Sequence, residues 1–163
     1  MPQQTEWRFC KKCTAMFWDG EQDKGRCAGG DTHAAAGYNF SLPYDEAGTA
    51  TVQTGWRFCG KCTAMFWDGE QDKGRCAGGD AHAAAGYNFS LPHDVPGQAR
   101  TQDSWRFCGK CRTLFYDGYA EKGRCPTGGG HASAGYNFVL PRLAYNGDPV
   151  PYGDDFVAVP VDE

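Results

Sequence analysis

The chain repeats itself with a strict period of 49 residues, and this period limits its fold more than any other feature. The sequence WRFC stands at residues 7–10, 56–59 and 105–108. Residues 7–45 and 56–94 differ at only three of 39 positions, so these two copies must share one fold. We divide the chain into three modules, residues 1–49, 50–98 and 99–147, followed by an extended C-terminal tail, residues 148–163, in which 156–159 form a strand-like burst.

The apolar pattern within each module predicts three short β-strands. In the first copy, apolar side chains alternate with a period of two at residues 7–9, 16–18 and 38–42. A single helical turn at 33–36 is the only helical candidate. The predicted fold class is therefore all-β, with modules packed either in a line or around a pseudo-threefold axis that brings the segments before each WRFC to the centre. Turn residues stand at 19–20, 28–31 and 36–37.

Cysteine and histidine recur with the spacing of metal ligands. Each module reads CxxC, thirteen residues, Cys, five residues, His, and this pattern uses all nine cysteines of the chain. Three thiolates and one imidazole are the soft and borderline ligands that zinc prefers, and a module this small needs an added constraint to fold. We therefore predict three structural Zn²⁺ ions, with iron as a minor competitor. The predicted ligands are Cys10, Cys13, Cys27 and His33; Cys59, Cys62, Cys76 and His82; and Cys108, Cys111, Cys125 and His131.

Two other uses of these residues fit less well. A disulfide scaffold would leave one thiol unpaired in each module unless bridges crossed between modules. A catalytic zinc site would keep one position for water, whereas four ligands recur together here. No nucleophile and base recur as a set, so the sequence does not predict an enzyme.

The repeated motif resembles known accessory repeats. WRFCGKC at 56–62, MFW at 65–67, GRCAGG at 74–79, His82 and GYNFSL at 86–91 resemble tandem Cys3His modules of bacterial and fungal extracellular proteins, often appended to hydrolases. The resemblance covers nearly the whole chain and implies binding rather than chemistry. The CxxC half is also similar to a zinc ribbon, although a ribbon has a second CxxC where this chain has CxxxxxH.

Two exposed surfaces are candidates for ligand binding. An aromatic-Asp-Gly motif offers a flat ring that can stack on the C–H face of a sugar, beside a carboxylate that accepts hydroxyl hydrogen bonds. A Tyr-Asn pair forms the second surface, because asparagine both donates and accepts. The alternative is that these rings only cover the metal or pack between modules. The candidate residues are Trp18, Asp19, Tyr38 and Asn39; Trp67, Asp68, Tyr87 and Asn88; and Tyr116, Asp117, Tyr136 and Asn137.

These features favour a multivalent carbohydrate-binding, lectin-like protein, because three weak sites bind a repetitive glycan with avidity. The alternative is a protein-interaction or structural module. A net charge of −4 argues against a nucleic-acid partner, and no apolar run is long enough to span a membrane. Residues 1–6 lack the features of a secretory signal, so we expect a cytoplasmic protein, while extracellular action and the oligomeric state stay open.

Overall fold

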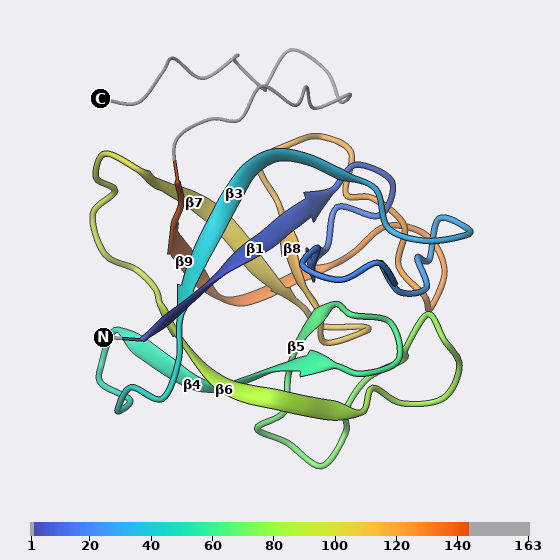
Figure 1. Cartoon of the computed structure of the whole chain (residues 1–163), viewed down its shortest axis with the longest axis horizontal. Helices are drawn as coiled ribbons and strands as arrows, with labels where there is room; N and C mark the ends of the chain where they lie inside the picture. Colours follow the sequence, from blue (N-terminus) through green and yellow to red (C-terminus); the bar gives the residue numbers. More distant parts are fainter. Residues whose placement is uncertain (1, 144–163) are drawn as a thin grey trace.

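The computed structural model describes residues 2–143, and within them the chain is all-β. Nine strands form three separate three-stranded antiparallel sheets, in the orders β2-β1-β3, β5-β4-β6 and β8-β7-β9 (Figure 1). The predicted fold class is confirmed. The strands are β1 (Gln3–Cys10), β2 (Met16–Trp18), β3 (Ala35–Pro43), β4 (Val52–Cys59), β5 (Met65–Trp67), β6 (Ala84–Pro92), β7 (Thr101–Cys108), β8 (Leu114–Tyr116) and β9 (Ser133–Pro141).

Two details of the strand prediction are wrong. The helical turn at 33–36 does not form, because β3 already begins at Ala35, which pairs with Cys10. The turn predicted at 36–37 is a β-bulge inside β3 instead. The register shifts there between Arg8 and Phe9, where β3 takes up two extra residues, Gly37 and Tyr38, and Gly37 has a φ of 77°.

One aromatic core joins the three sheets into a closed ring. The Trp7 ring lies edge-on to Phe58 and Phe89 of the second module, with ring centroids 6.2 and 5.2 Å away. The same contacts join Trp56 to the third module, and Trp105 to Phe9 and Phe40 of the first. All three tryptophans are fully buried in a single cluster. The modules are thus arranged around a pseudo-threefold axis.

Alternation along the short middle strand separates this shared core from the Cys/His clusters. Met16 of β2 lies in the central core, whereas Phe17 packs with the cysteines of its own module. The other two modules do the same. The described part of the chain contains no helix that is long and apolar enough to cross a membrane. The tail at 148–163, with its strand-like burst, lies outside the described residues.

Candidate metal centres and aromatic hollows

Three buried Cys3His clusters form where the sequence pattern places them. In each cluster the four ligand atoms lie within 4.8 Å of one another, and all twelve side chains are buried. CxxC begins at the last residue of the module's first strand, the third cysteine comes from the loop after the second strand, and the histidine precedes the third strand. The cysteines are all thiols. Each module thus contains a group that can hold one metal ion.

The distances fit a tetrahedral ion. With metal–sulfur bonds of about 2.3 Å and metal–nitrogen bonds of about 2.0–2.1 Å, the edges of a tetrahedron are about 3.8 Å between sulfurs and about 3.5 Å from sulfur to nitrogen. Cys10 Sγ lies 3.8 Å from Cys27 Sγ, and Cys13 Sγ lies 3.4 Å from His33 Nδ1. In the other modules the sulfur–nitrogen distances are 3.6 and 3.5 Å.

Each histidine also ties its cluster to the next module. His33 Nε2 lies 2.9 Å from the Cys62 carbonyl oxygen, and since a carbonyl only accepts, Nε2 carries the proton. Nδ1 is then free to bind a metal, and the hydrogen bond fixes the ring, as metal-ligating histidines require. Equivalent bonds join His82 to Cys111 and His131 to Cys13, which closes the ring of modules.

The thiols and the histidine of each cluster shift one another's pKa. Hydrogen bonds from Cys62 and Cys76 hold the pKa of the Cys59 thiol well below its usual range. Burial opposes protonation of His82, but hydrogen bonds and charge from Cys59 and Cys76 outweigh burial and raise its pKa to about 9. The other two histidines behave alike. Hydrogen bonds with Cys59 and Cys76, together with burial, raise the pKa of the Cys62 thiol instead. Each cluster thus holds a readily ionised thiol beside a protonated histidine, and a metal ion would take the place of the protons that these groups share.

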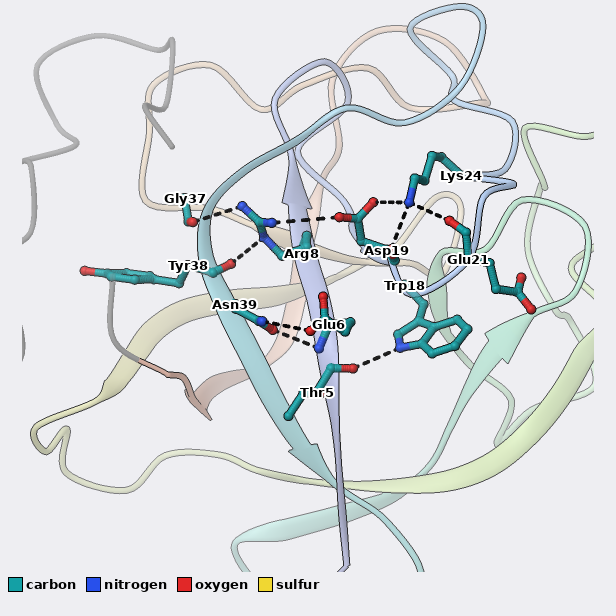
Figure 2. A network of polar contacts seen from close by, with 10 residues as sticks. All are labelled: Thr5, Glu6, Arg8, Trp18, Asp19, Glu21, Lys24, Gly37, Tyr38 and Asn39. Carbon is teal, nitrogen blue, oxygen red and sulfur yellow. Dashed lines mark hydrogen bonds and ion pairs between the residues drawn. The ribbon is translucent and has the colours of Figure 1, made fainter. Parts of the chain in front are cut away.

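The aspartate of the aromatic-Asp-Gly motif is engaged within the protein. Asp19 Oδ1 lies 2.9 Å from Lys24 Nζ, and its other oxygen lies 3.8 Å from Arg8 (Figure 2). Asp68 and Asp117 have the same pair of basic partners. These carboxylates hold the loop after the second strand, and they already have cationic partners before any ligand is bound.

The glycine of the motif makes room for the aromatic ring itself. A Cβ on Gly20 would lie 2.4 Å from the Trp18 ring, so only glycine fits there. Trp18 Nε1 donates to the Thr5 carbonyl at 2.9 Å (Figure 2). The Trp18 ring also lies edge-on to Phe58 of the next module. Trp18 is nevertheless only partly buried, as is Trp67. Part of each indole therefore stays accessible at the junction between two modules.

The asparagine of the Tyr-Asn pair completes a bulge in the first strand. Asn39 Oδ1 accepts the Glu6 backbone N–H at 2.8 Å, where Glu6 has a φ of 75° (Figure 2). Asn88 and Asn137 accept the N–H groups of Gly55 and Ser104 in the same way. The neighbouring tyrosines differ, because Tyr87 and Tyr136 are 42% and 43% exposed, whereas Tyr38 is 6% exposed.

Two equivalent hollows open at two of the three junctions. Between the first and second modules a hollow of about 190 Å³ lies beside Trp18, and between the second and third a hollow of about 180 Å³ lies beside Trp67. Every lining residue of the first has its counterpart 49 positions later in the second. The linings are Gln4, Trp18, Phe58, Ala85, Gly86, Tyr87 and Phe89; and Gln53, Trp67, Phe107, Ala134, Gly135, Tyr136 and Phe138.

The third junction has the same lining but almost no space, about 10 Å³. Tyr119 is added to the lining here, where the other modules have Glu21 and Glu70 outside their hollows. The Tyr119 ring is 4% exposed, and it packs against Phe9 and Tyr116, with centroids 6.1 and 5.1 Å away. Two side chains of the lining thus distinguish the closed junction from the open ones: Tyr119, and Tyr116 in place of a tryptophan.

The hollows combine predicted residues with others that the sequence analysis did not select. Trp18 and Tyr87 come together although they belong to different modules, as do Trp67 and Tyr136. The phenylalanine of WRFC and the glutamine before it were missed, because their joint placement depends on the closed ring. Comparison with protein-family models, with curated protein sequences and with solved structures found no significant match to this chain.

Proposed function

We propose that the protein is a sugar-binding protein whose three modules are each held by a structural Zn²⁺ ion. Four protein ligands in tetrahedral spacing suit zinc, and they leave no position for the water that a hydrolytic zinc needs. When bound, the ion would cross-link the loops that carry the four ligands. The cysteine sulfurs also accept hydrogen bonds from backbone N–H groups, such as that of Gly29 to Cys27 and that of Ala34 to Cys10.

The pair of open hollows carries the proposal of sugar binding. Each presents an indole and an exposed tyrosine, surfaces on which the C–H face of a sugar ring stacks. Glutamine supplies the polar contact. Gln4 Oε1 accepts the Trp7 indole N–H at 2.9 Å, and within residues 2–143 its amide nitrogen has no acceptor, so this group is free to bond a hydroxyl. Gln53 has the same arrangement.

The size and number of the hollows define the expected ligand. At about 180–190 Å³ each is smaller than the roughly 300–1,000 Å³ of typical small-molecule pockets, so a single sugar ring is the fitting unit. Two sites on one rigid ring of modules bind a glycan with many similar ends more tightly than either site alone. We therefore propose a divalent lectin, rather than the trivalent one that the repeat count favours.

A glycan array followed by calorimetry tests this proposal. We expect a subset of neutral glycans to bind with two sugar rings per chain, and W18A and W67A each to remove one ring from the stoichiometry. The matched control is Tyr116→Ala, which changes the equivalent ring at the closed junction and leaves the stoichiometry at two. A silent array, or a W18A/W67A double variant that still binds, would contradict the proposal.

A protein partner is the second candidate, because both hollows are lined mainly by apolar side chains. An aromatic or aliphatic side chain of a partner would fill such a hollow as a hot spot does. Competition with free sugars distinguishes the two candidate functions. A partner protein that is captured through Trp18 and Trp67, and that free monosaccharides do not displace, would favour protein recognition over sugar binding.

A further inference from the structure

Three arginines, one from each module, line a single hollow on the pseudo-threefold axis. The hollow has a volume of about 250 Å³, and its lining repeats with the module period. It lies next to the third cysteine of each of the three Cys3His clusters. The lining consists of Arg26, Cys27, Ala28 and Gly30; Arg75, Cys76 and Ala77; and Arg124, Cys125, Pro126 and Gly128.

The sequence KGRC places each arginine at this position. The cysteine binds in the cluster, and the lysine holds the Asp of its own module, as Lys24 holds Asp19. The glycine between them lies so close to the next module that a Cβ on Gly25 would be 2.2 Å from the Cys62 carbonyl oxygen. Gly74 and Gly123 make the same approach to Cys111 and Cys13. The arginine backbone is thereby fixed at the junction.

No acidic side chain among the described residues pairs with these arginines. Within residues 2–143, no ion pair or hydrogen bond joins the side chains of Arg26, Arg75 or Arg124 to another residue, and no acidic residue lines the hollow. Unpaired arginines are unusual in a chain with a net charge of −4. Many of its other basic side chains, such as Lys24, Lys73 and Arg112, form ion pairs. Three positive charges around one solvent-filled hollow raise the local potential and attract anions.

We propose that this hollow binds one oxyanion of the sulfate or phosphate type, either free or as the charged group of a larger ligand. The three guanidinium groups offer planar pairs of donors, which match oxyanion oxygens better than an ammonium group does. A tetrahedral oxyanion has three equivalent oxygens around a threefold axis, so it can face the three arginines in the same way. This site is separate from the sugar-binding hollows, and it does not depend on the proposed function.

Calorimetry with inorganic sulfate and inorganic phosphate, at constant ionic strength in chloride, tests the site on the full chain. We expect one anion per chain, and a loss of about tenfold in affinity for each of R26Q, R75Q and R124Q, since a hydrogen bond to a charged group contributes about 1.5–3 kcal/mol. A sulfated monosaccharide and its neutral parent sugar then show whether the anion binds free or attached to a sugar.

Matched variants separate local binding from overall charge. The triple variant R26Q/R75Q/R124Q and the control Q22E/Q71E/A120E lower the net charge by the same amount, but the control changes exposed equivalent positions outside the hollow. We expect only the arginine triple to lose the anion, while native mass spectrometry finds unchanged metal content in both. Equal losses in both variants would overturn the proposal.

Two further outcomes would also overturn it. Each cluster with a divalent ion carries a formal charge of about −1, since three thiolates face it, and this charge could cancel that of the arginines. Sulfate and phosphate would then bind no better than chloride. Binding of an oligonucleotide without binding of either inorganic anion would instead identify a polyanion surface rather than a site for one oxyanion.

Discussion

The open junctions and the closed junction are built on the same backbone, yet only the open ones offer a binding hollow. All three pair a WRFC phenylalanine with an aromatic ring of the preceding module and with a tyrosine from the third strand of the phenylalanine's own module. The closed junction differs through Tyr119, which stands where the others have glutamate, and through Tyr116, which replaces a tryptophan. The repeated sequence therefore gives all three junctions the same backbone, while single side chains determine which junctions have a hollow that a ligand can enter.

The largest effect is expected from breaking one Cys3His cluster, which we propose to be a structural zinc site. C62A should lose one ion, and because structural zinc contributes about 10–16 kcal/mol against a typical stability of about 5–15 kcal/mol, all three modules should unfold together. The shared core and the bond from His33 to the Cys62 carbonyl transmit the loss. Circular dichroism and native mass spectrometry measure it.

The control for this variant is K11G, because Lys11 is exposed and the other modules have glycine there. It should keep three ions and unfold within about 0.5 kcal/mol of the parent. A C62A chain that retains two ions and two folded modules would show that the modules fold independently, and the comparison of junctions would then concern separate units.

The next effect should convert the closed junction into an open one. Tyr119→Glu restores the residue of the other modules, and it should lower the free energy of unfolding by about 3–5 kcal/mol, as loss of a buried aromatic does. Chemical denaturation measures this cost. If the proposed sugar sites are correct, calorimetry should also count a third sugar ring per chain.

The reverse variant, Glu21→Tyr, tests the same idea at an open junction. The added ring should fill the hollow beside Trp18 and leave one sugar ring per chain, with metal content unchanged. Unchanged stoichiometry in both variants would mean that residue 119 does not control access, and the cause of closure would have to be sought elsewhere in the chain.

A smaller effect on sugar affinity should distinguish Trp18 and Trp67 from Tyr116, the equivalent residue at the closed junction. W18A and W67A should each weaken sugar binding at their own hollow by at least about 30-fold, because an aromatic anchor of this kind contributes about 2 kcal/mol or more. Titration of each single variant in calorimetry measures this. Y116A should leave the affinity unchanged, and equal losses in all three would contradict the distinction between open and closed junctions.

The smallest effect concerns the rings that cover the exposed tyrosines. Tyr44 stacks on Tyr87 with centroids 3.7 Å apart, and His93 stacks on Tyr136 at 3.6 Å. Y44A and H93A should each lower the free energy of unfolding by about 0.5–1.5 kcal/mol, the usual contribution of an aromatic pair. The conservative variant Y44F should retain nearly all of this, and a loss as large as that of Y44A would assign the effect to the hydroxyl instead.

The sequence by itself determined the repeat, the strands and the Cys3His clusters. The CxxC spacing is a local feature of the sequence. Period-two alternation likewise predicts that Met16 and Phe17 lie on opposite faces of their strand, without information about the neighbouring modules. Both features can therefore be recognised in the sequence alone. The same logic failed at 33–37, where an alanine-rich segment and a glycine indicate a helical turn and a loop. Pairing with β1 turns this segment into a bulged strand.

Only the tertiary structure decided how the modules meet. The contact of Trp18 with Phe58, the histidine bonds to the next module, and the convergence of Arg26, Arg75 and Arg124 all join residues of different modules. A repeated sequence carries the same local information in every copy, so it does not state whether copies stack in a line or close. Closure of the ring follows from packing of each buried tryptophan into the next module, and it creates both the junction hollows and the axial hollow.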